Sequence, residues 1–265
     1  MAHDVARQAG GRFLLRIEDI DSTRCRPDHI DGIMEDLRWL GLNWDGEVWR
    51  QSVRMAVYAD ALDRLKAMDL LYPCFCTRAE IAAEIAASGA APHGPEGQLY
   101  PGTCRRLTPA QRQERLADMP CAWRLDMAGA VKRAGLLQWH DSVAGMVTAD
   151  PMAFGDVVLA RKEVAASYHL CVVIDDAAQG VTDVVRGQDL FTATHVHRLL
   201  QALLGLPTPR YHHHPLLVDA GGRRLAKRDR AATLASMREA GVDPAMLVAR
   251  LRRGELPVGI AGEKA

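Results

Sequence analysis

Apolar residues recur at helical spacing in two neighbouring segments near the start of the chain. Both segments, residues 27–46 and 52–72, place apolar side chains three or four positions apart: Ile30, Ile33, Met34, Leu37 and Leu40 in the first, and Val53, Val57, Tyr58, Leu62 and Leu65 in the second. Side chains at this spacing share one face of an α-helix. The pattern therefore predicts two amphipathic helices, each with one buried side.

An apolar stretch precedes the first of these helices and ends in acidic residues. The sequence GRFLLRIEDID, residues 11–21, begins at a double glycine, which is typical of the end of a preceding helix. Its apolar body predicts a buried strand. Glu18 is then expected at the carboxyl end of that strand.

The second half of the chain continues the alternation of strands and helices. A continuous apolar run at residues 170–174 predicts another strand, because a strand covered on both faces of a parallel sheet shows no apolar–polar alternation. A helix is expected over residues 191–205, ended by Gly205 and Pro207, and residues 234–254 are also expected to be helical. This order predicts an α/β fold around a parallel sheet.

Composition and charge limit the possible classes of protein. The chain has 265 residues with 33 basic and 33 acidic side chains, so any nucleic-acid site must be local and not the result of an overall positive field. No apolar stretch approaches the ~20 residues of a membrane span, and the first residues lack the apolar centre of a secretory signal. A cytoplasmic protein is therefore expected.

The cysteines favour a metal site over a disulfide framework. Six cysteines scattered along a chain of this length do not fit a disulfide scaffold. Cys74 and Cys76 can face one metal ion from a tight turn, and Cys104 is the obvious third ligand. Residues 73–120 are rich in Gly, Pro and Ala, so a metal cross-link would stabilise them, whereas buried thiols in a loop are the alternative. A zinc site needs a fourth ligand, for which the candidates are His93, Tyr100 and Cys121.

Polar residues near predicted strand ends form a candidate ligand site, because open parallel sheets bind ligands beyond the carboxyl ends of their strands. Glu18 could bind an ammonium group, and Arg186 could bind a carboxylate through two parallel hydrogen bonds. A free amino acid carries both of these groups. A set of surface ion pairs is the alternative. The polar residues of this set are Glu18, Tyr168, Asp175, Asp176 and Arg186.

Two further segments carry clustered basic or imidazole side chains. The sequence GGRRLAKRDR at residues 221–230 suits a polyphosphate, with a solvated basic turn as the alternative. The run His212 to His214 does not by itself predict a metal site, because on a strand His213 points away from both neighbours. Neither GxxxxGK[ST] nor GxGxxG occurs, which disfavours P-loop and dinucleotide-binding enzymes.

Four motifs, taken in their order, resemble those of the glutamyl-tRNA synthetase family of class I. They are LLRIEDIDSTR, CFC followed by YPGTC, YHLCVVIDDAAQGVTDVVRGQDL, and HHPLLVDAGGRRLAKRD. The resemblance implies the α/β fold of class I aminoacyl-tRNA synthetases: a Rossmann-type parallel sheet, a small zinc-binding insertion and a short helical C-terminal region. The expected domains are a catalytic domain (residues 1–72 and 121–205), the insertion (73–120), and a KMSKS-type loop with its tail (206–265).

The resemblance also implies roles for individual residues. Glu18, Tyr168 and Arg186 would bind glutamate. ATP, with Mg²⁺, would be bound by the KMSKS-type loop, in which Lys227 would be the catalytic lysine beside Arg224, Leu225, Ala226 and Arg228. One Zn²⁺ would be held by Cys74, Cys76, Tyr100 and Cys104.

The resemblance is greatest to a short branch of the family. About 35 residues follow Arg230, whereas an anticodon-binding domain would need roughly 150–200. For this branch the resemblance implies a monomer that transfers glutamate, with ATP, to the queuosine base at the wobble position of tRNA(Asp). The alternatives are a truncated glutamyl-tRNA synthetase and a catalytically impaired tRNA-binding paralogue.

The start of the sequence departs from the family pattern. The family's opening strand and its HxGH signature, which would bind the ATP phosphates at a helix N-terminus, do not occur in this sequence. Loss of one preorganised hydrogen-bond donor to the transition state typically lowers the rate by a factor on the order of 10²–10³. We therefore expect the true start codon to lie upstream of Met1, and the written chain alone to have little activity.

Overall fold

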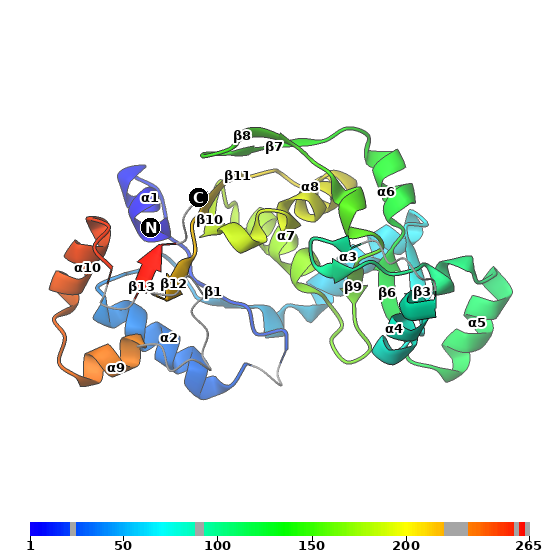
Figure 1. Cartoon of the computed structure of the whole chain (residues 1–265), viewed down its shortest axis with the longest axis horizontal. Helices are drawn as coiled ribbons and strands as arrows, with labels where there is room; N and C mark the ends of the chain where they lie inside the picture. Colours follow the sequence, from blue (N-terminus) through cyan, green and yellow to red (C-terminus); the bar gives the residue numbers. More distant parts are fainter. Residues whose placement is uncertain (22–24, 88–92, 220–232, 257–259, 263–265) are drawn as a thin grey trace. The chain divides into compact units, whose positions relative to one another are not determined.

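The computed structural model describes residues 1–21, 25–87, 93–219, 233–256 and 260–262 (Figure 1). The chain forms two compact units. Unit 1 comprises residues 1–50, 185–189 and 213–265, and unit 2 comprises residues 51–184 and 190–212. Unit 1 is therefore assembled from three separate stretches of the chain.

Unit 1 bears out the predicted start of the chain in part. Gly10, in the left-handed region at φ +65°, follows the first helix as expected, but the strand is limited to Arg16–Ile17, of which only Ile17 is buried, and it ends directly before Glu18. The first two strands, β1 and β2, pair in parallel. The elements of this unit are α1 (Ala2–Gln8), β1 (Arg16–Ile17), α2 (Pro27–Trp39), β2 (Trp49–Arg50), β12 (Leu217–Asp219), α9 (Leu234–Glu239), α10 (Pro244–Arg252) and β13 (Ile260–Gly262).

Ion pairs join the early and late segments of unit 1. Arg238 on α9 pairs with Glu35, at 2.9 Å, and with Asp36 on α2. Arg252 on α10 pairs with Asp4 on α1 at 2.5 Å. These basic residues of the helical tail therefore have acidic partners within the unit.

Unit 2 contains an antiparallel three-stranded sheet in the order β3-β6-β9, and its strand β7 pairs with β8 in a hairpin. The helix predicted after residue 191 is α8, and Gly205 ends it in the left-handed conformation. The elements are η1 (Gln51–Val53), α3 (Met55–Ala67), β3 (Leu71–Cys74), α4 (Arg78–Ala87), β4 (His93–Gly94), β5 (Gly97–Gln98), η2 (Thr103–Arg106), α5 (Pro109–Asp118), β6 (Ala122–Leu125), α6 (Met127–Ala134), β7 (Gln138–Asp141), β8 (Gly145–Thr148), η3 (Pro151–Phe154), β9 (Val158–Ala160), α7 (Tyr168–Gln179) and α8 (Ala193–Leu204).

A four-stranded sheet in the order β10-β11-β7-β8 completes the architecture. Strands β10 (Asp183–Gly187) and β11 (Arg210–His214) each begin in unit 2 and continue into unit 1, with η4 (Gln188–Leu190) following β10. Strands β11 and β7 are parallel. Among the described residues, none of the helices is both long and apolar enough to span a bilayer.

The prediction of a strand at residues 170–174 is wrong, because these residues belong to the helix α7. All five are buried, together with Asp175. A helix buried on nearly every side gives the same unbroken apolar run as a strand buried on both faces, so periodicity cannot separate the two. Tyr168, Asp175 and Asp176 are consequently helix residues and not strand-end groups.

Asp175 is the centre of a buried polar network within unit 2. Its carboxylate, with 0% of the residue exposed, accepts hydrogen bonds from Arg54 Nε at 2.8 Å, Tyr58 OH at 2.7 Å and Gln51 Nε2 at 3.2 Å. Burial and the bond to this carboxylate raise the pKa of Tyr58, so the phenol remains the donor. The network fixes α7 against η1 and α3.

Candidate functional site

Three thiols from two separate segments of the chain converge in unit 2. Cys74 ends β3, Cys76 follows two residues later, and Cys104 lies in η2. Their sulfur atoms all lie within 4.8 Å of one another. Gly102, with φ +83°, begins the tight turn that brings Cys104 back to the other two. The same residues form a small core, in which Cys74 and Cys104 are buried beside Tyr72 and Phe75.

The hydroxyl of Tyr100 completes this cluster. It lies 3.5 Å from the sulfur atoms of both Cys74 and Cys76, and it accepts a hydrogen bond from the backbone N–H of Cys104 at 2.8 Å. A tetrahedral zinc ion with ordinary bond lengths separates a sulfur and an oxygen ligand by about 3.5 Å, and two sulfur ligands by about 3.8 Å. The sulfur–oxygen distances match, and the Cys76–Cys104 distance is somewhat shorter, 3.4 Å.

The donor set therefore fits a tetrahedral Zn²⁺ with three sulfur ligands and one oxygen ligand. Of the three candidates for the fourth ligand, Tyr100 is the one that hydrogen-bonds to the thiols within the described part of the chain. Cys121 packs against the small core, but neither Cys121 nor His93 joins the ligand cluster found among the described residues. That the cluster binds an ion, and that this ion is Zn²⁺, stays a prediction.

The thiols of the cluster differ in acidity. Burial raises the pKa of Cys76 to about 12. Burial also opposes ionisation of Cys104, but hydrogen bonds from Tyr100 and the backbone N–H of Phe75 outweigh it and lower the pKa of this thiol. Cys104 therefore ionises more readily than Cys76.

A cavity of about 860 Å³ adjoins the cluster within unit 2. Cys76 and Tyr100 form part of its wall, and Tyr168, at the start of α7, forms another part. Basic side chains also line it, among them Arg124, Arg161 and Lys162. The cavity is large enough for a small polar ligand and presents both hydroxyl and cationic groups to it.

A chain of hydrogen bonds supports the Tyr168 side of this cavity. Glu96 Oε1 lies 3.3 Å from His169 Nε2, and His169 Nδ1 lies 3.1 Å from His197 Nε2. The bond to His169 lowers the pKa of Glu96. The rings of His169 and His197 pack edgewise against Tyr168. Sequence reasoning missed these hydrogen bonds, although His197 stands among the apolar residues of the predicted helix over residues 191–205, and its position there was a usable signal.

The other two predicted glutamate contacts belong to unit 1. Glu18 follows β1, and its carboxylate pairs with Arg16 at 3.2 Å. Arg186, on β10, donates from Nε to His213 Nε2 at 3.1 Å. His213 is buried while His212 and His214 are partly exposed, which confirms the alternation expected of this strand. The convergence of Glu18, Tyr168 and Arg186 on one ligand stays a prediction, since they are divided between the units.

The predicted ATP-binding loop lies outside the described residues. This applies to Arg224, Leu225, Ala226, Lys227 and Arg228, whose roles remain predictions. The strand β12 precedes this segment in the sequence.

Comparison with known proteins establishes the class. Residues 1–263 match the family model of tRNA synthetases class I (E and Q), catalytic domain, so the chain belongs to the class I aminoacyl-tRNA synthetases, which are ligases. Within this class it belongs to the glutamyl-Q tRNA(Asp) synthetase family. It is 49% identical to the relative of that name from Rhodobacter capsulatus, over 92% of this chain and 89% of the relative.

Other relatives and solved structures agree with this placement. The glutamyl-Q tRNA(Asp) synthetase of Symbiobacterium thermophilum is 46% identical, over 93% of this chain and 77% of the relative. The crystal structure of a glutamate tRNA ligase from Elizabethkingia meningosepticum, in complex with its amino acid, matches with a TM-score of 0.76 and 26% identity. That match covers 93% of this chain, which spans 56% of the ligase. The predicted class I synthetase α/β fold is thereby confirmed.

Proposed function

We propose that the protein activates L-glutamate with ATP and transfers the glutamyl group to the queuosine base at the wobble position of tRNA(Asp). The observation that carries the proposal is the 49% identity, along nearly the whole chain, to a relative named for this tRNA. The likeness to a glutamate tRNA ligase supports the choice of amino acid. ATP, with Mg²⁺, is the expected second substrate, as in class I synthetases generally.

The reaction has two steps that this chain's residues would support. The α-carboxylate of glutamate attacks the α-phosphorus of ATP, and pyrophosphate leaves. The product is glutamyl-adenylate. A hydroxyl of the acceptor base then attacks the carbonyl carbon, and AMP leaves with the bonding electrons. In this proposal Arg186 and Glu18 hold the charged groups of glutamate, Tyr168 contacts it from the cavity wall, and Lys227 stabilises the charge that develops on the phosphates.

The bond between Arg186 and His213 would help substrate binding. Because His213 accepts from Nε, the plane of the guanidinium group is fixed. A fixed guanidinium loses less rotamer freedom when it binds a carboxylate through two bonds. His213 is therefore proposed as the residue that orients Arg186.

One Zn²⁺ is proposed to bind Cys74, Cys76, Tyr100 and Cys104. Its contribution would be structural, because a four-ligand protein site is closed to substrate. The insertion needs such a cross-link, since its own buried core consists of few side chains beyond those of the cluster itself.

The function is tested by two assays on protein expressed from the complete reading frame. The first is glutamate-dependent ATP–pyrophosphate exchange, expected without any tRNA. The second is transfer of labelled glutamate to tRNA(Asp), expected only when the tRNA contains queuosine. Matched controls are tRNA(Asp) from cells unable to make queuosine, and tRNA(Glu). Label found only on tRNA(Glu) would identify a glutamyl-tRNA synthetase instead, and no exchange at all would identify a paralogue without activation chemistry.

The metal proposal predicts about one zinc per chain, lost on Cys74→Ser. Removal of one thiolate leaves an incomplete site, and zinc binding contributes to folding of the segment that it joins. Elemental analysis of freshly purified, unchelated protein measures the zinc content. Cys121→Ser is the matched control, because Cys121 packs beside the same core without joining the cluster, and it should retain the metal. Zinc retained by Cys74→Ser, or lost from Cys121→Ser, would contradict the ligand set.

A further inference from the structure

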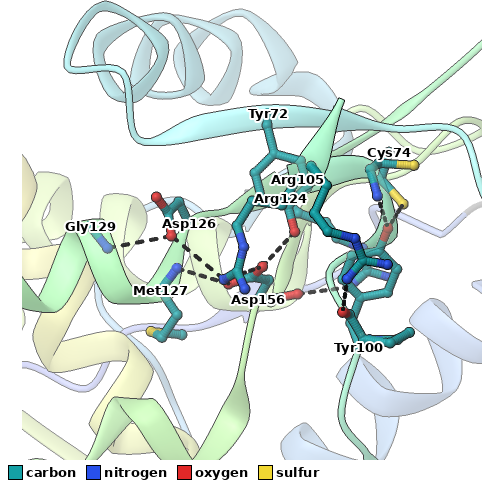
Figure 2. Close-up of polar contacts among 12 residues, drawn as sticks. Tyr72, Cys74, Tyr100, Arg105, Arg124, Asp126, Met127, Gly129 and Asp156 are labelled. Carbon is teal, nitrogen blue, oxygen red and sulfur yellow. Dashed lines mark hydrogen bonds and ion pairs between the residues drawn. The ribbon is translucent and has the colours of Figure 1, made fainter. Parts of the chain in front are cut away.

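Arg124, on β6, stacks on the ring of Tyr100. Its guanidinium carbon lies 3.9 Å from the ring centroid (Figure 2). Nη1 donates a hydrogen bond to the backbone oxygen of Asp156 at 2.7 Å. The guanidinium group is therefore anchored to the backbone of one residue while its face covers the ring of another.

The anchor belongs to a network that reaches both thiol-bearing segments. The Asp156 residue is 4% exposed, and its carboxylate accepts hydrogen bonds from Tyr72 OH at 2.5 Å, Arg105 Nη1 at 3.2 Å and the backbone N–H of Met127 at 3.0 Å (Figure 2). Tyr72 precedes Cys74 by two residues, and Arg105 directly follows Cys104. Arg124 thus connects the Tyr100 ring to the network that fixes the segments of Cys74 and Cys104.

Support for the Tyr100 ring matters because the backbone of this residue is not held in a helix or strand. It lies in a loop between β5 and η2, outside any helix or strand. A side chain on a loop holds a ligand atom less rigidly than one on a strand. Contacts that neighbouring residues make with the ligand side chain therefore decide whether its ligand atom stays in place. The stack of Arg124 on the ring supplies that contact from a strand.

Charge balance gives the same residue a second role. Three thiolates and one phenolate around Zn²⁺ leave a net charge of about −2. A cation over the electron-rich face of the phenolate ring offsets part of this charge. Arg115 also lies near the cluster, 5.9 Å from the ring centroid of Phe75, but it stacks on Phe75 and not on the Tyr100 ring.

We propose that Arg124 is a positioning residue of the metal site, which holds Tyr100 as the fourth ligand and offsets the negative charge of the site. The proposal rests on the proposed zinc ligands and is independent of which tRNA the enzyme uses. Loss of Arg124 leaves the three thiols in place and releases the phenol.

Arg124→Gln tests the proposal through zinc affinity, measured by competition with a chromogenic chelator. The affinity for zinc should fall about 10–100-fold, as is typical when a residue that holds a metal ligand in place is removed. Arg115→Gln is the matched control, because it removes one positive charge that lies over Phe75 of the same small core and not over the Tyr100 ring. It should change the affinity by less than about two-fold. Equal losses in both variants, or no loss in Arg124→Gln, would overturn the proposal.

A double-mutant cycle with Tyr100→Phe separates positioning from a general effect on the fold. If Arg124 acts through Tyr100, then Arg124→Gln has no further effect on zinc affinity in the Tyr100→Phe background. The cobalt-substituted proteins should show the same altered absorption spectrum for Arg124→Gln and Tyr100→Phe. A full additional loss in the double variant, or a wild-type cobalt spectrum for Arg124→Gln, would refute the role.

If circular dichroism shows that Arg124→Gln does not fold, a more conservative variant tests the proposal. Arg124→Lys keeps the positive charge and loses the planar stack. It should reproduce the altered cobalt spectrum, and an unchanged spectrum would overturn the positioning role. A wild-type protein that binds neither zinc nor cobalt would overturn the metal site and this inference together.

Discussion

Replacement of Arg186 by alanine is expected to lower glutamate-dependent ATP–pyrophosphate exchange roughly 30- to several-thousand-fold, because removal of one side of a buried charge pair costs ~2–5 kcal/mol. In the proposed site the substrate carboxylate would lose a guanidinium that His213 orients. Arg186→Lys should also be impaired, since an ammonium group cannot form two parallel bonds with a carboxylate.

Arg210→Ala is the matched control for the Arg186 prediction. Arg210 begins the strand β11 that also carries His213, but its side chain is 70% exposed and pairs with Asp183. Removal of an exposed ion pair should leave the exchange rate within about two-fold of wild type. Exchange kinetics measured over a range of glutamate concentrations separate lost binding from lost rate. Wild-type kinetics in Arg186→Ala would refute the substrate assignment.

Asp175→Ala is expected to reduce the free energy of unfolding by about 3–5 kcal/mol, because it removes one partner of a buried ion pair and leaves the other charge uncompensated. The same change deprives Tyr58 and Gln51 of their acceptor. Chemical denaturation monitored by circular dichroism measures the loss. Asp175→Asn retains part of the hydrogen bonding and should lose less.

The control for the Asp175 prediction is an exposed aspartate on α3, the helix that α7 contacts through Asp175 and Tyr58. Asp63, on α3, pairs with Lys66, and its side chain is 70% exposed. Asp63→Ala should change the free energy of unfolding by less than about 0.5 kcal/mol. Similar losses for the two variants would show that burial does not govern the effect.

The helices were predictable from the sequence wherever one face of the helix is polar. Helices α2 and α3 follow the apolar spacing of their segments, and Gly205 ends α8 where expected. The pattern failed at α7, where burial on nearly every side removes the polar face that marks a helix. Periodicity therefore indicates a helix only where the helix meets solvent.

The candidate site was predictable as a set of residue types but not as an arrangement. CFC and Cys104 indicated a metal site, yet spacing along the chain could not decide which of His93, Tyr100 and Cys121 reaches the thiols. That choice depends on where a loop folds back in three dimensions. The Asp156 network is likewise invisible to local patterns, because its partner Tyr72 lies 84 residues away.

The segmented build of unit 1 has a consequence for synthesis on the ribosome. The contact between Asp4 and Arg252 joins helices from opposite ends of the described chain. Helices α1 and α2 therefore leave the ribosome well before α9 and α10, whereas most of unit 2 emerges between them as one continuous stretch. Unit 2 is thus free to fold during elongation, while α1 and α2 stay without these partners until α9 and α10 have been synthesised.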